Sequence, residues 1–574
     1  MLSKTKLLQR WFLDHITSAD EPYSLDPHQA KIVLDNHKNT LVTARAGSGK
    51  TRTIVAKCIY LLAHEKVNPE EIIIFAFNRK ARAELNERLH LVQYQGNPIL
   101  PPDINPATTF HAFAHHLLKD EPYQLAEATR TENFLKNVLA LFLHKNQQTN
   151  REQRELLREL SRLEQFITRS EQLFFDDYTK LGQKISALTP SANRRELERN
   201  FNILNAYHAK MNELGLMNYN QMIAFATKKL HQNANLANAK NENTIANSDS
   251  AHANPENAIA NFEDANTKNK TAIANLKSSN ANLETTIANS PLAETKNFRY
   301  IFIDEYQDFS LLFLNLILAL RENCPGSHLL AVGDDWQAIN RFAGSDVKYF
   351  QNFSTYFPED NIKLFIPTNY RSGKHIVENA NYFMANSLRD FQGCKSGQKS
   401  RTEIKIMDIR KTPLSISEQT NIPLGIRQLL YDTLLIAVRN PNKSIKILSR
   451  NNMLSYKNWS LEKFAQLVRH NMKKQKLKTD NLTFSTIHKS KGLESDIVIL
   501  LEVDDDKFPA PDRDGDLYKI FGETEATRKF DAYLLFYVAI TRAKEKLFIL
   551  TSTPPTHQKN SDNILNFLDD RFLT

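Results

Sequence analysis

Residues 40–57, TLVTARAGSGKTRTIVAK, constrain the fold of this chain more tightly than any other stretch. The apolar start is typical of a buried strand and residues 53–56 are typical of a helix, with Gly47 and Gly49 in between. Glycines in such a turn let the backbone wrap around phosphate, which the free amides at the helix start then face. The stretch therefore predicts an α/β sheet that binds phosphate at the end of a strand.

The same loop carries side chains suited to a nucleotide. Lys50 supplies positive charge for the β- and γ-phosphates, and Thr51 supplies a hydroxyl ligand for Mg²⁺. Ser48 and Arg52 complete the predicted nucleotide-binding residues of the loop. Ala44 stands where the general pattern G-x-x-x-x-G-K-T has its first glycine, but the strand-to-helix context still favours a site for ATP.

Residues 298–310, FRYIFIDEYQDFS, predict a short buried strand that stops at Asp304 and Glu305. Ligands of α/β sheets bind at the carboxyl ends of central strands. We therefore expect Asp304 to hold Mg²⁺ and Glu305 to act as the base for an attacking water. The alternative is that the two acids only begin a solvated helix, where they suit the helix dipole. The phosphate loop favours the first interpretation.

Two further strand-to-helix passages, residues 72–77 and 108–113, predict loops at the same edge of the sheet. Their residues combine aromatic faces for base stacking with donors for phosphate, which is the mixture that single-strand binding needs. The alternative is that they are amphipathic edges of the core. The candidate residues are Phe77, Arg79, Lys80, Thr109, Phe110 and His111.

Three polar side chains elsewhere could also reach the nucleotide. Gln337 follows a predicted strand at residues 329–332, where it could sense a γ-phosphate or orient water. Arg371 and Arg542 lie beside strand-like runs in the second half of the chain, and either could reach a phosphate held by the first half.

Gln29 follows a predicted helix start at Asp26 and Pro27. A side-chain amide can donate and accept at once, as reading an adenine edge requires. Taken alone, Gln29 is better explained as a surface glutamine.

The length of 574 residues predicts three to four domains. We expect a first α/β domain at residues 1–116 and 213–366, interrupted by a helical subdomain at 117–212 that is rich in helix-spaced leucines. Residues 231–290 are dominated by Asn, Ala, Thr and Ser, and predict a disordered insertion. Residues 367–574 predict a second doubly wound domain.

Composition sets outer limits on function. The net charge of +9 permits a polyanionic partner without requiring one. The apolar run LLFLNLILAL is too short to span a bilayer, and charges interrupt the N-terminus where a signal peptide needs an apolar core, so we expect a cytoplasmic protein. Cys58, Cys324 and Cys394 are scattered without metal-ligand spacing and predict reduced thiols.

Nine motifs in order make the chain resemble the superfamily 1 DNA helicases of the UvrD/Rep type. They are LDPHQ, AGSGKT, AFNRKA, TFHAF, FIDEYQD, VGDDWQAINRF, TNYRS, TIHKSKGLE and YVAITRAK. The motif sequences GDDWQ, RF and TFHA are most similar to those of the helicase IV branch. The resemblance implies two RecA-like motor domains that hydrolyse ATP with Mg²⁺ at the cleft between them.

Carried over residue by residue, the resemblance implies further roles. Gln29 would read adenine, Tyr370 would stack on it, and Glu494 would hold the ribose. Gln337, Arg371 and Arg542 would contact the γ-phosphate, the two arginines acting as fingers from the second domain.

For DNA, the resemblance points to Phe342 as a base-stacking aromatic and to His488 as a further contact. Four positions depart from the commoner pattern, all of them concerning DNA contacts rather than the ATPase set. They are Asn340, where tyrosine is usual, Ala343, where arginine is common, and Tyr533 and Leu534, which replace paired arginines.

The expected function is a 3′-to-5′ DNA helicase or single-stranded DNA translocase that acts on single-stranded and tailed duplex DNA in repair, recombination or replication. One alternative is an ATP-driven nucleoprotein remodeller that does not itself unwind long duplexes, and another is a regulatory subunit of a nuclease. UvrD/Rep relatives carry a large helical subdomain between the positions of Arg371 and Thr486. Here that stretch leaves too few residues for another packed domain, so we expect this subdomain to be missing or vestigial.

Overall fold

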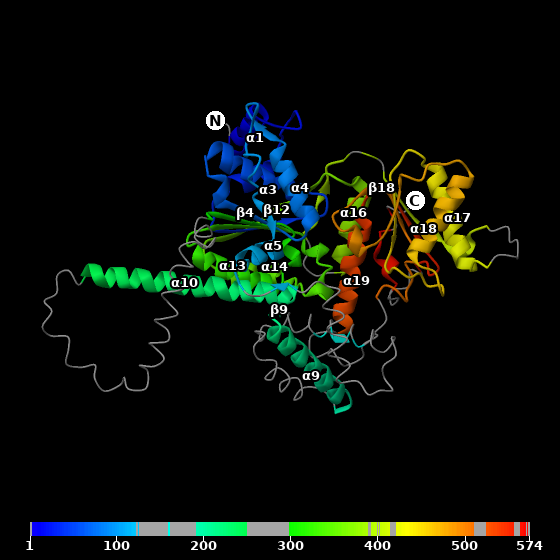
Figure 1. The fold of residues 1–574 in the computed structure, drawn as a ribbon. Helices are drawn as coiled ribbons and strands as arrows, with labels where there is room; N and C mark the ends of the chain where they lie inside the picture. The colour runs from blue at the N-terminus through cyan, green and yellow to red at the C-terminus, as the bar shows by residue number, and fades with distance from the viewer. Residues whose placement is uncertain are drawn as a thin grey trace.

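The structure, a computed structural model, describes residues 3–121, 124–125, 156, 159–160, 163, 191–249, 298–387, 392–398, 400, 402–413, 421–509, 524–555, 563–569 and 571. Two parallel sheets organise these residues, and Figure 1 shows them beside one another, each covered by helices. The α/β class with two parallel-sheet domains is therefore confirmed.

The first sheet has six strands in the order β12-β3-β11-β10-β4-β7, and every neighbouring pair is parallel. In that order the strands are β12 (Asn361–Ile366), β3 (Asn39–Ala44), β11 (His328–Gly333), β10 (Tyr300–Ile303), β4 (Ile72–Ala76) and β7 (Ala107–Thr109). β10 and β4 are buried along their whole length, as strands covered on both faces must be. Because all six strands run the same way, their carboxyl ends meet at one edge.

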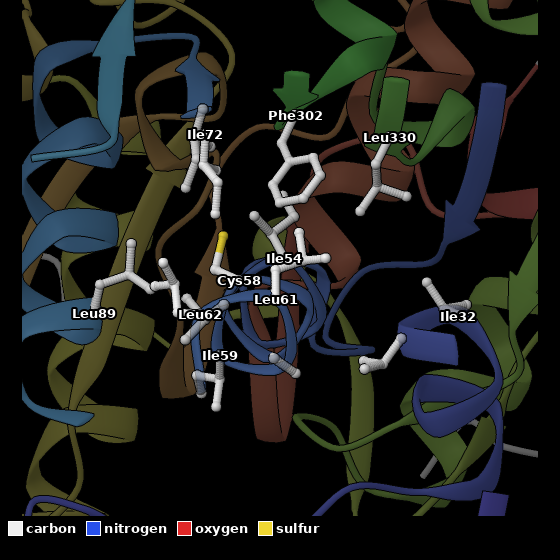
Figure 2. Close-up of a cluster of buried hydrophobic side chains, with 14 of the residues drawn as sticks. Ile32, Ile54, Cys58, Ile59, Leu61, Leu62, Ile72, Leu89, Phe302 and Leu330 are labelled. Carbon is white, nitrogen blue, oxygen red and sulfur yellow. The ribbon is translucent and has the colours of Figure 1, made fainter. Parts of the chain in front are cut away.

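The two faces of this sheet pack against different helices. One face meets α2 (Pro27–Leu34), α3 (Lys50–Ile59) and the π-helical turn η1 (Tyr60–His64). Figure 2 shows Ile54, Cys58 and Leu61 from these helices among the side chains of Ile72 and Phe302. The other face meets α5 (Phe110–Leu117), α10 (Tyr219–Asp249) and α13 (Leu311–Asn323). The alternation of side chains along each strand separates these two cores.

The second sheet has five parallel strands in the order β15-β19-β18-β16-β17. They are β15 (Glu403–Asp408), β19 (Ala543–Thr551), β18 (Ser495–Leu500), β16 (Ile445–Ser449) and β17 (Leu482–Thr486). Helices α16 (Lys374–Ser387) and α19 (Glu525–Ile540) cover one face, and α17 (Leu424–Arg439) and α18 (Leu461–Lys474) cover the other (Figure 1).

The described chain has further α-helices and strands besides those named above. They are α1 (Lys4–His15), β1 (Ile16–Ser18), β2 (Glu21–Pro22), α4 (Arg79–His90), β5 (Val92–Tyr94), β6 (Asn97–Pro98), β8 (Gln124–Leu125), α9 (Ser191–Glu213), β9 (Leu216–Met217), α14 (Lys348–Gln351), α15 (Phe353–Tyr356), β13 (Thr368–Asn369) and β14 (Lys395–Ser396).

The first half of the chain, residues 1–366, contains the first sheet, and the second half, residues 367–574, contains the second sheet. The described parts of these two halves meet at a packed junction. Trp336, which follows β11, is 1% exposed and its ring lies 5.3 Å from that of Tyr537 on α19, edge to face. Ala46 of the phosphate loop belongs to the same buried cluster as α16 and α19. The carboxyl edge of the first sheet therefore faces the second half of the chain.

Between Arg371 and Thr486, the helices of eight or more residues in the described part are α16, α17 and α18, and all three pack on the second sheet. The strand and helix expected within this stretch are β16 and α18. The described helices of this stretch thus belong to the layers that cover the second sheet.

Of the predicted helical subdomain at 117–212, α9 is the main described element, and most of the rest lies outside the described residues. Helix α10 continues through residues 231–249, where the sequence predicts the start of the disordered insertion. That boundary is corrected: once the packed first turns of α10 are formed, each further residue costs little to add. Residues 250–290 of the predicted insertion lie outside the described residues.

We expect deletion of residues 250–290 to leave ATPase activity and DNA binding nearly unchanged. The cost of closing a loop depends only weakly on its length, and α10 packs on the sheet through its earlier turns, which include Met222 and Leu230. The measurement is the ATPase rate and the melting temperature of the shortened chain beside the full one. Failure of the shortened chain to fold would show that the segment is part of the core.

In the described part of the chain, no helix is both long and apolar enough to cross a bilayer. Cys58, Cys324 and Cys394 are all buried free thiols outside any disulfide, as predicted. Burial raises the pKa of the Cys58 thiol, which keeps it protonated inside the core.

Candidate nucleotide site and nucleic-acid interface

The phosphate loop joins β3 to α3 in the way the sequence predicts. Gly47 and Gly49 adopt positive φ angles of 73° and 84°. A Cβ added at Gly47 would lie 2.6 Å from the Cβ of Arg371, so only glycine allows this close approach. No side chain caps the start of α3, which leaves its first amides available to an anion.

The two acids at the end of β10 lie beside this loop. The Nζ of Lys50 is 3.8 Å from Oε2 of Glu305. Glu305 has a φ of 52°, a left-handed conformation that is costly for this residue and is typically retained at functional sites. Asp304 is 4% exposed and its Oδ1 accepts a hydrogen bond from the Glu305 amide at 2.9 Å.

The two carboxylates carry their charge unequally. Burial and then the charge of Glu305 raise the pKa of Asp304. Burial also opposes ionisation of Glu305, but Lys50 and then Lys491 outweigh it and lower the pKa of this carboxyl. Glu305 is therefore the ionised member of the pair, as a base requires.

Gln337 is held by groups from both halves of the chain. Its Nε2 donates to Oδ2 of Asp334 at 2.6 Å, and its Oε1 accepts from Nη2 of Arg542 at 3.1 Å. Gln307 links the same region to the acids, because its Nε2 donates to Glu305 and its Oε1 accepts from the Asp334 amide at 2.8 Å. Gln337 thus sits between the acids and an arginine of the second half.

Both predicted arginine fingers reach the site. Arg542 is fully buried, and burial and then the charge of Arg371 lower its pKa to about 9, so it is charged at neutral pH. Arg371 pairs through Nε with Oε2 of Glu494 at 2.5 Å, and its Nη1 donates to the Thr541 carbonyl at 3.2 Å. In the described structure Arg371 is thus held by groups of its own half.

The predicted adenine residues also lie together. The Tyr370 amide donates to the Gly47 carbonyl at 2.8 Å, and the Tyr370 hydroxyl donates to Asp26. Gln29 is 2% exposed, which rules out the surface interpretation. Its Oε1 accepts from the Asp26 amide at 3.2 Å, while its buried Nε2 has no hydrogen-bond partner among the residues that the structure describes. A buried donor left unpaired is costly, and a ligand acceptor would satisfy it.

One cavity of about 770 Å³ brings these groups together between the two halves. The predicted site residues that line it are Gly47, Ser48, Gly49, Lys50, Thr51, Arg52, Asp304, Glu305, Gln337, Tyr370, Arg371, Glu494 and Arg542, together with Phe77, Lys80 and His488. Gln29 lies just beneath, since a Cβ added at Gly49 would be 3.0 Å from its Nε2.

These residues fit a magnesium nucleotide. Asp304 and Thr51 offer the hard oxygen ligands that Mg²⁺ prefers, and they line the cavity next to the positive-φ glycines. A divalent cation would also offset the charge of the acid pair, in which Oε2 of Glu305 lies 3.8 Å from the Nζ of Lys50.

The predicted DNA residues separate into two groups. Phe342, 58% exposed, meets His488 of the second half edge to face, with ring centroids 5.2 Å apart. Phe77 and Arg79 lie at the end of β4 and the start of α4, where Arg79 is exposed. Burial, then Arg450 and Lys491, lower the pKa of His488 to about 4, so its ring is neutral and suited to stacking.

Phe110 is a correction. It is 2% exposed, and its ring stacks between Phe75 at 4.7 Å and Phe313 at 4.1 Å, so it fills the core and is not placed to stack on a base. Thr109 is likewise occupied, because its hydroxyl caps α5 by accepting from the Ala112 amide at 3.1 Å. Both residues follow the core-edge alternative, since a helix start needs a cap and an apolar anchor.

His111 is intermediate in exposure between the exposed candidates and the buried Phe110 and Thr109. It is half-buried against Tyr219 and Phe313, with ring centroids 5.3 and 5.8 Å away, and burial lowers its pKa.

Three basic residues at the site were not predicted. Lys491 pairs with Asp308 at 2.6 Å and donates to the Gln337 carbonyl at 2.7 Å, joining the two halves. Arg450 follows β16 with a buried Nη1 that lacks a hydrogen-bond partner among the described residues. Arg45 lies inside the phosphate loop and is 3% exposed. Of the three, only Lys491 stands in one of the motifs, TIHKSKGLE, that could have identified it.

Comparison with known proteins agrees with this geometry. Residues 25–358 match the UvrD/REP helicase N-terminal domain, and residues 455–553 match the UvrD-like helicase C-terminal domain. The chain is 28% identical to DNA helicase IV of Escherichia coli K12 over 541 residues, which are 92% of this chain and 68% of that protein.

Two other relatives show the same similarity. A probable DNA helicase of Mycoplasma pneumoniae is 25% identical over 535 residues, which are 91% of this chain and 82% of that one. The ATP-dependent DNA helicase PcrA of Staphylococcus aureus is 23% identical over 372 residues, which are 63% of this chain and 40% of that one.

Proposed function

Because this chain belongs to the UvrD/REP helicase family, we propose that it is an ATP-dependent DNA helicase that moves 3′ to 5′ along single-stranded DNA. The observation that supports this most strongly is one cavity with groups from both halves of the chain. The phosphate loop and two acids of the first half line it together with two arginines of the second half. Such a cavity couples ATP hydrolysis to the relative position of the two halves, because its catalytic set is complete only when they close.

In this proposal each residue has one task. Lys50 and the α3 amides bind the β- and γ-phosphates, and Tyr370 and Gln29 hold the adenine. Thr51 and Asp304 hold Mg²⁺, which supplies neutralisation of phosphate charge when bound. Glu305 takes the proton of the attacking water. The remaining assignments are Gln337, Arg371 and Arg542 at the γ-phosphate and Glu494 at the ribose.

The DNA strand would cross the neighbouring strand ends. Phe342 and His488 offer aromatic faces from opposite halves, and Arg79 is an exposed cation at the start of α4. Arg450 adds a buried Nη1 without a hydrogen-bond partner in the described part of the chain, which a backbone phosphate would satisfy. Changes in the distance between the halves would then move the strand.

A second candidate is a translocase or nucleoprotein remodeller that separates long duplexes poorly without a partner. The observation that favours it is that the described helices between Arg371 and Thr486 all pack on the second sheet. Such a chain would lack a separate helical body to engage the duplex ahead of the tracked strand.

Strand displacement on tailed duplexes tests the direction of movement and the choice between the two candidates. We expect ATP-dependent displacement of a short duplex with a 3′ tail, little on a 5′ tail and none on a blunt end. ATPase stimulation by single-stranded DNA without displacement of long duplexes would favour the remodeller. Displacement from a 5′ tail alone would contradict the proposed direction.

A further inference from the structure

Arg45 is a buried cation inside the phosphate loop to which the sequence assigns no role. Its Cζ lies 3.7 Å above the centroid of the Trp336 ring. Its Nη1 is 2.8 Å from Oδ1 of Asp334 and also contacts Asp335, while its Nε donates to the Gln392 carbonyl at 2.9 Å. A planar guanidinium can make all these contacts at once, whereas a lysine ammonium cannot.

Asp334 connects Arg45 to Gln337. This aspartate is fully buried, and its second oxygen, Oδ2, accepts from Nε2 of Gln337 at 2.6 Å. Because the amide nitrogen is used there, the Gln337 oxygen is the atom that faces Nη2 of Arg542 at 3.1 Å. The orientation of the Gln337 amide therefore depends on the position of the Asp334 carboxylate.

Arg45 is the cation that holds the Asp334 carboxylate in place. Burial disfavours the charge on Arg45, but the carboxylates of Asp334 and Asp335 outweigh it and raise the pKa of the guanidinium. Without that cation, the buried Asp334 carboxylate would lose its ion pair and reorient. A reoriented Asp334 would no longer accept from Nε2 of Gln337, which would allow the Gln337 amide to turn its nitrogen toward Arg542.

Arg45 also joins two parts of the chain across the cleft. Gln392, whose carbonyl it binds, lies between α16 and β14 in the second half. Trp336, on which it stacks, contacts Tyr537 of α19. The buried guanidinium of Arg45 thus connects the phosphate loop to Asp334, beside Gln337, and to Gln392 of the second half.

We propose that Arg45 is a positioning residue for ATP hydrolysis, which holds Asp334 so that the Gln337 amide presents its oxygen toward Arg542. The inference rests on the proposed action of Gln337 at the γ-phosphate. Arg45 itself touches no reacting atom and acts through Asp334 and Gln337.

A double-mutant cycle on the full chain tests this. The variants are Arg45→Lys, Gln337→Ala and the two together, measured for kcat of DNA-stimulated ATP hydrolysis and for the Kd of ATP. We expect Arg45→Lys to lower kcat about tenfold with a Kd within about threefold, because small misplacements cost turnover more than binding. In the Gln337→Ala background we expect Arg45→Lys to add less than about twofold, because coupled residues do not act additively.

Arg321→Lys is the matched control. Arg321 on α13 is partly buried, and its Nη1 donates to Oδ1 of Asn39 at 2.6 Å, away from the cavity. The control should leave kcat unchanged even if both Arg-to-Lys variants lower the melting temperature. Should Arg45→Lys fail to fold, Asp334→Asn carries the same cycle, because an asparagine amide turned toward Gln337 would donate to it.

Three results would overturn the inference. If Arg45→Lys kept the wild-type kcat while Gln337→Ala lowered it, Arg45 would have no positioning role, and the proposed role of Gln337 would stand. Losses that multiply in the double variant would mean that Arg45 acts independently of Gln337. Wild-type turnover in Gln337→Ala would refute the proposed action of Gln337 itself and the inference with it.

Discussion

Replacing Glu305 with glutamine is expected to lower the kcat of ATP hydrolysis by at least about a hundredfold while ATP still binds. Glutamine preserves the shape of the side chain but cannot take a proton from water at neutral pH. It also removes the negative charge that faces Lys50 at 3.8 Å. The remaining loop, Tyr370 and the arginines are untouched, so the Kd of ATP should change little.

Single-turnover hydrolysis and equilibrium ATP binding measure the two effects separately. Glu322→Gln on α13 makes the same chemical change at an exposed residue that pairs with His231, and should leave kcat unchanged. Turnover of Glu305→Gln near the wild-type rate would mean that another group activates the water.

Replacing Arg542 with lysine is expected to lower kcat about a thousandfold, the lower end of what an arginine finger contributes. Nε donates to the Val538 carbonyl at 2.8 Å, and Nη2 donates to both Gln337 and the Thr541 hydroxyl at 3.1 Å. A single ammonium cannot reproduce this fork. Lysine also starts from a lower pKa than arginine, so the burial that brings Arg542 to about 9 would leave it largely neutral.

The kcat of the Arg542→Lys variant is measured with the melting temperature and the Kd of ATP, so that misfolding and lost binding are separated from lost catalysis. Arg321→Lys again provides the matched control on α13. A folded Arg542→Lys variant with kcat within about threefold of wild type would contradict the finger role, which predicts a loss near a thousandfold.

The strand ends could be predicted because their determinants are local. Residues 300–303 form β10 as predicted, since an apolar run followed by two acids admits few other conformations. The turn at Gly47 and Gly49 follows from the same logic, because positive φ angles need glycine. These positions carry a lysine, a hydroxyl and two acids. Such side chains indicate a magnesium nucleotide site even when the rest of the fold is unknown.

Other features could not be predicted from local pattern. An aromatic residue at the start of a helix looks the same whether it anchors the core or faces DNA, and Phe110 anchors the core. Helix α10 continues past residue 231 because packing of its first turns outweighs an unfavourable composition. Local pattern alone favours a surface glutamine at Gln29; the family resemblance placed it at the site, and the tertiary structure showed its burial under Gly49.

By itself, the sequence determined the α/β class, the phosphate loop, the acid pair and the family, because each depends on residues that are neighbours in the chain. Only the tertiary structure decided which strand-end side chains converge on one cavity. Arg45 and Asp334 are separated by 289 positions, and Arg542 and Gln337 by 205. Such contacts have no local periodicity; they exist because parallel strands bring their carboxyl ends to one edge and the second sheet closes over it.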